Sequence, residues 1–315
     1  MIVISNSEIQ KYKECKRSWY VTYYLQRAPR AEVVHPVGAT WLGTRMHAAL
    51  EAYYSPELKL SRYDAARVLR DIYMMDIAQW PDAEEDLLAE HDLSHTMLVG
   101  YFDWLAETGA DQDLTVLATE REILVPFSEE VMIRGRLDSI VWSKHLKAKL
   151  FLDHKNVIQF LDEDYLDRDE QAKFYMMLQR LDKGQKDMHV DGGIFNMLRK
   201  VKRTAKSKPP YYKRITVRHN SDTLNSMYRR TYQAVNEIID LRNSLDSGIL
   251  QEQVAYPTPT RDCVWKCPLA SGLCVMMDDG SDWAGYLEEQ FALTDPYARY
   301  SESGYLDRLE QKGKL

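Results

Sequence analysis

The chain has 315 residues, of which 45% are hydrophobic, and its formal net charge at pH 7 is −7. This hydrophobic content supports a substantial core, and the length fits one large domain or two small ones. The acidic balance argues against a protein that coats nucleic acid generally, although it is compatible with a local basic groove. Because no run approaches the roughly 18 apolar residues of a membrane span and the start lacks a signal-peptide pattern, we expect a cytoplasmic protein.

The first third of the chain is predicted to be mostly helical. Ser5 and Glu8 have the spacing of a capping box, which predicts a helix from Ser5 to about Leu25 with Glu8 reaching back to the cap. A linker over 29–36 follows. Helical periodicity then recurs in three segments, which cover residues 41–54, 61–80 and 84–107.

The middle of the chain has the periodicity of β-strands. Three alternating segments predict an antiparallel meander over residues 115–127, 131–142 and 149–158. The order continues with a helix over 164–181, a strand over 190–198 and a long helix over 222–247. This βββαβ order favours one α/β domain over residues 1–315, with a helical elaboration over 41–110 and a catalytic core over 115–198.

A carboxylate and an ammonium group follow a buried strand. Asp153 and Lys155 end the apolar run 150–152, and alternate residues of a strand share a face, so both side chains address one place while His154 points the other way. An Asp-x-Lys triplet is common by chance, but a charged pair that ends a buried strand is costly unless it is paired or functional. If Asp138 lies on the neighbouring strand, two crowded carboxylates attract a cation. The trio therefore predicts metal-assisted chemistry on a phosphate.

Four further residues become candidate site residues when they are considered together with this trio. His47 follows Gly43 on a predicted helix, where the glycine would allow close backbone approach and the imidazole could be a metal ligand. Gln171 and Tyr175 share one face of the helix after the catalytic strand. Glu120 lies in the strand before Asp138, and an inward carboxylate there needs a partner or a metal. Taken singly, each of these residues is more often structural than functional.

The motifs Gly-x-x-x-His, Gly-x-x-Asp, Asp-x-Lys and Gln-x-x-x-Tyr occur in this order, with predicted strands under the middle two. Their order resembles the RecB-type branch of the PD-(D/E)XK nuclease superfamily over residues 43–198. The leading proline of the superfamily name is absent. The resemblance implies an α/β fold with a restriction-endonuclease-like core, a mixed central sheet flanked by helices and a helical N-terminal part.

The resemblance also implies roles for the site residues. Lys155 would position the attacking water or stabilise developing charge, and Gln171 and Tyr175 would support the site and the DNA end. Carboxylate and carbonyl ligands suit Mg²⁺, and a histidine ligand makes Mn²⁺ equally acceptable. The implied metal ligands are His47, Asp138, Asp153 and the main-chain carbonyl of His154. The candidate catalytic residues are Asp138, Asp153, Lys155, Gln171, Tyr175 and Glu120.

The leading functional hypothesis is a metal-dependent deoxyribonuclease, an exonuclease for single strands or DNA ends in recombination, repair or phage DNA metabolism. The alternative is a non-cleaving DNA-binding or scaffolding module that retains a nuclease fold, which the intact motifs disfavour. An electron-carrying iron–sulfur protein is a third hypothesis, and nothing else in the chain indicates a redox partner. Because the chain has no Walker motif, any helicase or recombinase would be a separate partner, and an oligomer stays open.

A basic segment follows the predicted catalytic core. Residues 199–214 include eight Lys or Arg residues and no acid, with two tyrosines among them. Such residues could neutralise phosphates and stack on unpaired bases, and a solvated loop is the equally weighted alternative. The candidate DNA-binding residues are Arg199, Lys200, Lys202, Arg203, Lys206, Lys208, Tyr211 and Tyr212.

Four cysteines complete the set of candidate ligands: Cys15, Cys263, Cys267 and Cys274. Disulfides are not expected in the cytoplasm, and four thiolates fit Zn²⁺ or a [4Fe-4S] cluster equally on ligand count. One N-terminal cysteine followed by three C-terminal ones resembles the iron–sulfur nucleases of the AddB and CRISPR-adaptation type. That resemblance implies a [4Fe-4S] cluster, with structural Zn²⁺ as the alternative, that staples residues 1–25 to residues 261–275.

Overall fold

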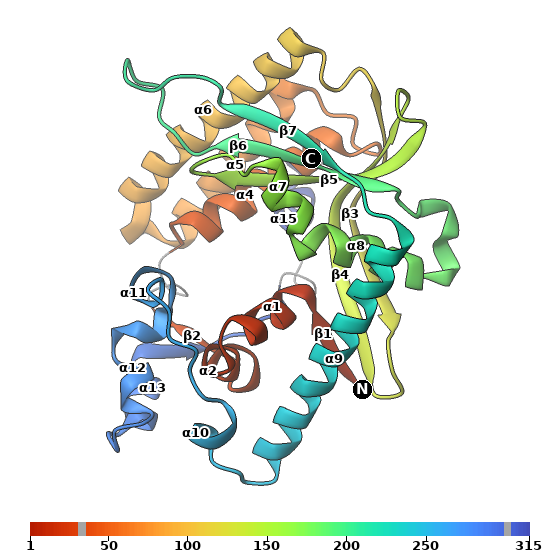
Figure 1. Ribbon diagram of the computed structural model, residues 1–315. Helices are drawn as coiled ribbons and strands as arrows, with labels where there is room; N and C mark the ends of the chain where they lie inside the picture. Colours follow the sequence, from red (N-terminus) through yellow and green to blue (C-terminus); the bar gives the residue numbers. More distant parts are fainter. Residues whose placement is uncertain (31–35, 299–303) are drawn as a thin grey trace. The chain divides into compact units, whose positions relative to one another are not determined.

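The structure is a computed structural model that describes residues 1–30, 36–298 and 304–315. The chain divides into two compact units, which we describe separately (Figure 1). Unit 1 is drawn from residues 1–35, 126–133 and 228–302, and unit 2 from residues 36–125, 134–227 and 303–315. Among the described helices, none is both long enough and apolar enough to cross a lipid bilayer.

A six-stranded mixed sheet forms the centre of the fold. Its strand order is β1-β4-β5-β6-β7, and β3 also pairs with β4. The β4–β5 and β6–β7 pairs are antiparallel, whereas β5 and β6 are parallel, which confirms the expected mixed sheet. The strands are β1 (Ile2–Ser5), β3 (Leu114–Pro126), β4 (Val131–Ser143), β5 (Ala148–Val157), β6 (Gly192–Arg199) and β7 (Tyr212–Val217).

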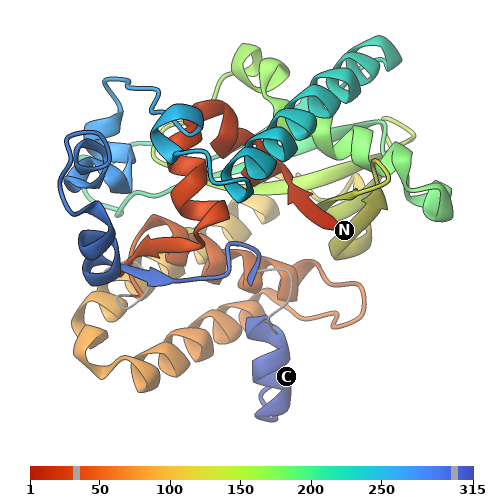
Figure 2. The ribbon, with the colours of Figure 1, turned by 90° about the horizontal axis from the view of Figure 1, so that it is seen from below.

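Three helices of unit 2 lie side by side (Figures 1 and 2): α4 (Ala39–Tyr54), α5 (Arg62–Gln79) and α6 (Glu84–Thr108). Of these, α4 contacts β5 and α6 contacts β6. Their apolar residues share one buried core with Val141 of β4, Leu150 and Leu152 of β5 and Ile194 of β6. The last described helix, α15 (Tyr305–Gln311), packs on α4 and α5. The core therefore anchors α4, which carries His47, against the strands that carry the acidic residues.

The helix expected over 164–181 is two helices, α7 (Glu163–Arg168) and α8 (Glu170–Leu181). Asp169 interrupts the helix with an extended backbone (φ −53°, ψ 134°), and its carboxylate accepts a hydrogen bond from the Gln171 N–H at 2.6 Å. This cap begins α8 as a separate helix. Unit 2 also contains two 3₁₀ turns, η2 (Pro81–Ala83) and η3 (Lys183–Met188). The sequence analysis did not predict strand β7.

Unit 1 combines the first described residues with the long helix α9 (Ser221–Asp246), which begins in unit 2. The expected Ser5 cap is present, because Ser5 Oγ accepts from the Glu8 N–H. The expected return of Glu8 to that cap is wrong: its carboxylate, fully buried, accepts hydrogen bonds from Trp19, Arg242 and Tyr297 instead. The expected single helix is α1 (Asn6–Glu14), α2 (Lys16–Trp19) and the π-helix η1 (Tyr20–Tyr24).

Short elements form the rest of unit 1. Strands β2 (Arg27–Pro29) and β8 (Phe291–Leu293) pair as a two-stranded antiparallel sheet. Most of the linker predicted over 29–36 lies outside the described residues. The remaining elements are α10 (Gln251–Val254), α11 (Cys263–Lys266), η4 (Pro268–Ser271), α12 (Leu273–Met276) and α13 (Trp283–Gln290).

Candidate metal centre and active site

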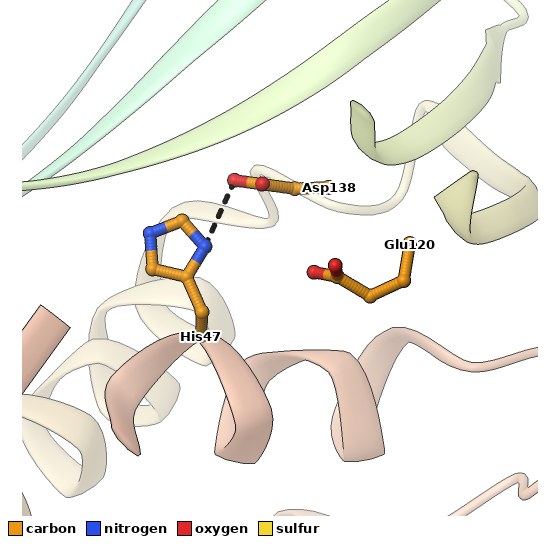
Figure 3. Close-up of side chains that lie close together, drawn as sticks. All are labelled: His47, Glu120 and Asp138. Carbon is orange, nitrogen blue, oxygen red and sulfur yellow. Dashed lines mark ion pairs between the residues drawn. The ribbon is translucent and has the colours of Figure 1, made fainter. Parts of the chain in front are cut away.

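Three side chains from different elements of unit 2 converge on one point (Figure 3). His47 of α4, Glu120 of β3 and Asp138 of β4 each place a ligand atom within 4.8 Å of the other two. His47 Nδ1 lies 3.2 Å from Asp138 Oδ2, and that oxygen also accepts the His154 main-chain N–H at 2.8 Å. Two carboxylates and an imidazole are a donor set that suits Mg²⁺ or Mn²⁺, so these residues fit a divalent metal.

Glu120 reaches the centre through an unusual backbone. Its φ is +43°, a left-handed value that a residue with a Cβ rarely adopts within a strand. Such outliers cluster at functional sites. The Glu120 carboxylate also pairs with Arg136 Nε at 2.8 Å. Glu120, which the sequence analysis proposed only from its strand, is therefore brought together with His47 and Asp138.

The β4–β5 register places the second acidic residue nearby. Ser139 pairs with Leu152, so Asp138 and Asp153 are the next residues along the two antiparallel strands. Gly135, at the start of Gly-x-x-Asp, is needed for packing: a Cβ there would lie 2.7 Å from Leu178 Cδ2. The glycine thus lets α8 approach the strand that carries Asp138. Gly43 differs, because a Cβ there would meet nothing within 4 Å, so its expected close backbone approach is absent among the described residues.

Asp153, Lys155, Gln171 and Tyr175 form one hydrogen-bonded chain between β5 and α8. Lys155 Nζ lies 2.8 Å from Asp153 Oδ2 and donates to Gln171 Oε1 at 2.5 Å. The Gln171 amide donates in turn to Asp153 Oδ1 at 3.2 Å and to the Tyr175 hydroxyl at 3.0 Å. The structure therefore brings the Asp-x-Lys and Gln-x-x-x-Tyr motifs together, and Lys155 and Gln171 hold Asp153 in position.

Burial and neighbouring charges separate the two carboxylates electrostatically. Burial raises the pKa of Asp153 to about 6 against the opposing charge of Lys155. Burial alone would also raise the pKa of Asp138, but His47 and the His154 N–H hold that pKa well below its ordinary value. Burial acts to lower the pKa of His47, yet Asp138 outweighs it and raises that pKa to about 9. Without metal, the centre therefore holds a His47 imidazolium at neutral pH.

Metal binding at pH 7 is expected to release about one proton per ion, because a metal takes the neutral imidazole. The affinity should rise with pH up to about 9, the pKa of His47, and then level off. Titration calorimetry with Mn²⁺ in Tris and in HEPES measures this release from the difference in heat. His47→Gln should remove the difference between buffers, and equal heats for the unaltered protein would contradict the prediction.

His154 occupies the opposite face of β5 and is 3% exposed. Its ring stacks on Tyr54, with centroids 5.3 Å apart, and burial lowers its pKa to about 3 despite the opposing charge of Asp138, so the imidazole is neutral. His154 Nδ1 lies 2.8 Å from Asn196 Nδ2. The expected role of the His154 main-chain carbonyl as a ligand stays a prediction, and the side chain serves a separate network.

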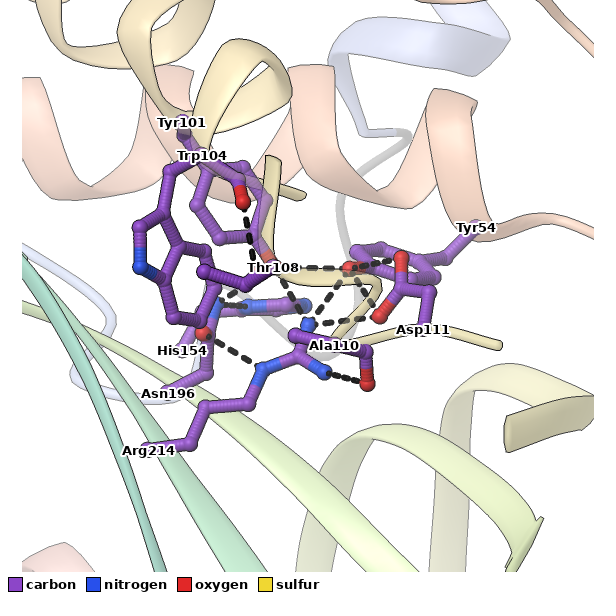
Figure 4. Close-up of polar contacts among 9 residues, drawn as sticks. All are labelled: Tyr54, Tyr101, Trp104, Thr108, Ala110, Asp111, His154, Asn196 and Arg214. Atoms are coloured by element: carbon purple, nitrogen blue, oxygen red, sulfur yellow. Dashed lines mark hydrogen bonds and ion pairs between the residues drawn. The ribbon is translucent and has the colours of Figure 1, made fainter. Parts of the chain in front are cut away.

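That network is centred on Arg214 and links β5, β6 and β7 to α4 and α6 (Figure 4). Arg214 Nε donates to Asn196 Oδ1 at 3.0 Å, which fixes the Asn196 amide as the donor to His154 Nδ1. Arg214 also pairs with Asp111 at 2.7 Å. The sequence analysis missed Asn196 and Arg214 as supports of the catalytic strand. Arg214 further donates to Tyr54, Tyr101 and the Ala110 carbonyl.

Two more residues of α4 were missed. Glu51 lies one turn after His47 on α4, and burial, followed by the charge of Glu120, raises its pKa to about 8. Arg45 is fully buried and bonds Asp76 and Glu90, which fixes α4 on α5 and α6. A signal for Glu51 exists in the sequence, since an i, i+4 spacing from His47 places both on one helix face.

The basic segment is only partly available to a ligand. Lys202, Lys206 and Lys208 are exposed in the loop between β6 and β7. The Arg203 guanidinium lies 3.3 Å from the centroid of the Tyr211 ring. The expected stacking of a base on Tyr212 is wrong for this conformation, because Tyr212 is 6% exposed and its hydroxyl donates to the Met97 carbonyl at 2.7 Å.

All four cysteines belong to unit 1, and all four are free thiols. Burial raises the pKa of Cys267, and the charges of Cys15, Cys263 and Cys274 act in the same direction. The Thr258 N–H lies 3.4 Å from Cys15 Sγ and the Thr260 N–H 3.3 Å from Cys263 Sγ.

Arg17 adds a positive charge beside this cysteine cluster. Its Nη1 donates to the Cys274 carbonyl at 2.7 Å and lies 3.9 Å from Cys274 Sγ. Asp278 orients the guanidinium through two further bonds of 2.7 and 2.6 Å. N–H groups and a cation beside these sulfurs have the chemistry of an environment for thiolate ligands to a metal or cluster.

Comparison with known families decides the class of this site. A model of the PD-(D/E)XK nuclease superfamily matches residues 3–272. The chain belongs to this superfamily. Membership in the PD-(D/E)XK superfamily implies a nuclease that hydrolyses DNA with Mg²⁺ or Mn²⁺, and the mixed sheet flanked by helices agrees with a restriction-endonuclease-like fold.

Two further comparisons leave this assignment unchanged. No curated protein matches the chain. Among solved structures, one titled "Crystal structure of SSO0001" is similar over 52% of this chain and 68% of that chain, with 13% identity and a TM-score of 0.26.

Proposed function

We propose that unit 2 is a metal-dependent deoxyribonuclease of the RecB-type branch, and that it acts as an exonuclease on single strands or DNA ends. The observation that carries the proposal is the convergence of His47, Glu120 and Asp138 beside the Asp153–Lys155 pair. The candidate biological processes are recombination, repair and phage DNA metabolism.

Each of these residues would have a separate role in hydrolysis. His47, Asp138, Asp153 and the His154 carbonyl would hold the metal, with Glu120 at the same centre. When bound, the metal supplies a nucleophilic hydroxide and neutralises charge on the phosphate. Lys155 would orient the attacking water and stabilise the negative charge that develops on the phosphate oxygens. Because Gln171 bonds both Asp153 and Lys155, it would keep them in the geometry that the reaction needs.

Single-stranded DNA would be guided by the basic loop between β6 and β7. The exposed ammonium groups of Lys202, Lys206 and Lys208 are suited to phosphates, and they would make binding weaken as salt rises. Arg203 and Tyr211 already stack on each other, so we assign them to shaping the loop. Arg199 holds the same loop by donating to the Pro210 carbonyl at 2.9 Å.

The cysteine cluster would hold a [4Fe-4S] cluster, with Zn²⁺ as the alternative. The support is the presence of all four free thiols in unit 1, together with the N–H groups directed at the sulfurs of Cys15 and Cys263. Such hydrogen bonds are the usual environment of cluster-bound thiolates. A cluster there would tie the first helices to the segment around α11 and α12, two parts of unit 1 that are distant in sequence.

Digestion of matched linear and circular DNA tests the proposed activity. With Mg²⁺ or Mn²⁺, the protein should release nucleotides from end-labelled linear single strands, leave circular strands intact and stop when EDTA is added. Cleavage of the circles would overturn the exonuclease assignment. Intact DNA in every reaction, with DNA binding retained, would favour a non-cleaving module instead.

A further inference from the structure

Neither the backbone conformation nor the packing of the described residues requires the glycine at position 43 of α4. Gly43 lies inside a 16-residue helix, and its φ is not in the left-handed region that requires glycine. Glycine is the least favourable residue except proline in a helix interior. Packing does not explain it either, since a Cβ at Gly43 would meet nothing within 4 Å, whereas at Gly135 it would meet Leu178. Among the described residues, nothing needs Gly43 to lack a side chain.

The position of Gly43 relates it to the metal centre. Gly43 and His47 are four residues apart, so they share one face of α4 and are separated by about 6 Å along the helix axis. The His47 side chain is 32% exposed although its Nδ1 contacts Asp138, so this face is open to solvent at the centre. Gly43 is itself only partly shielded. No described residue therefore fills the space above Gly43, which lies on the same face of α4 as the centre.

We propose that the sugar–phosphate backbone of the substrate strand crosses α4 at Gly43 when the scissile phosphate lies at the metal centre. Gly43 is then a positioning residue, because it leaves the space that the strand occupies. This inference rests on the proposed nuclease function and adds the path of the strand to it. A side chain at this position would not disturb the fold, but it would exclude the strand.

Two substitutions of increasing size test this path. Gly43→Ala and Gly43→Leu should keep or raise the melting temperature, by about 2 °C for the alanine variant, because both residues favour a helix more than glycine does. Binding of a labelled single-stranded 20-mer, measured by fluorescence anisotropy in an Asp153→Asn background with Mg²⁺, should weaken about threefold for alanine and at least tenfold for leucine. The KM for the same strand should rise in the same order in the otherwise unaltered enzyme.

The matched control is Thr44→Leu. Thr44 is the next residue of α4, is exposed, and donates its hydroxyl to the Thr40 carbonyl of the preceding turn at 3.1 Å. This variant should bind the 20-mer as the parent does. Unchanged affinity and KM for Gly43→Leu would overturn the inference while DNA cleavage by the unaltered protein stands. A lower melting temperature for Gly43→Leu would also overturn it, because the space would then be filled by the protein.

Discussion

Asp153→Asn is expected to reduce DNA hydrolysis by about a thousand-fold or more and to leave the fold intact. The substitution keeps the size and shape of the side chain but removes the charge that a metal ligand needs. Asparagine can still accept the Gln171 amide hydrogen bond, so the β5–α8 contact remains. Initial rates on end-labelled linear DNA and thermal unfolding of the same samples measure both parts of the prediction.

Asp162→Asn is the matched control for this variant. Asp162 is exposed and caps α7 by accepting the Tyr165 N–H at 2.6 Å, and asparagine caps helices as well as aspartate does. The control removes an exposed carboxylate without touching the centre, so its rate should equal that of the unaltered protein. A rate for Asp153→Asn close to that of this control would refute the assignment of Asp153.

Cys15→Ser is expected to remove the bound metal from unit 1 and to destabilise that unit by several kcal/mol, on the order found for structural metal sites. The physical reason is that the thiol of Cys15 would be one of four ligands and comes from a segment distant in sequence from the other three. Iron, zinc and sulfide analysis of anaerobically purified protein, together with thermal unfolding, measures the loss.

Lys16→Met is the control for the cysteine variant. Lys16 follows Cys15 directly and donates to the exposed Tyr256 hydroxyl at 3.2 Å, so its replacement disturbs the same segment without removing a thiol. This variant should keep its metal and nearly all of its stability. A Cys15→Ser protein with the metal content and melting temperature of the control would show that the cysteines are ordinary buried thiols.

Local patterns in the sequence were enough to predict which of the candidate acidic residues lie close together. Alternation in β5 placed Asp153 and Lys155 on one side and His154 on the other, and the expected antiparallel pairing of the two strands placed Asp138 beside Asp153. The i, i+4 rule placed Gln171 and Tyr175 together. These relations depend on neighbours within one element or one hairpin, so periodicity alone contains them.

The supports of the site depend on contacts between distant segments, and the sequence analysis missed them. Arg214 belongs to a run of basic residues that predicted either a phosphate-binding segment or a solvated loop, yet β7 turns its side chain inward to Asn196 and Asp111. Tyr212 of the same run is buried against α6. Glu8 likewise leaves its expected cap because Trp19 and Arg242 offer buried donors. Each outcome was decided by a partner that lies far away in the chain.

The position of a bound metal tests the central proposal most directly. Crystals grown with Mn²⁺ and measured at the manganese absorption edge would locate the ion by its anomalous scattering. We expect one strong peak in unit 2 within coordination distance of His47, Asp138 and Asp153. A protein that cleaves DNA with Mn²⁺ but shows its manganese peak away from these three residues would contradict the proposed active site.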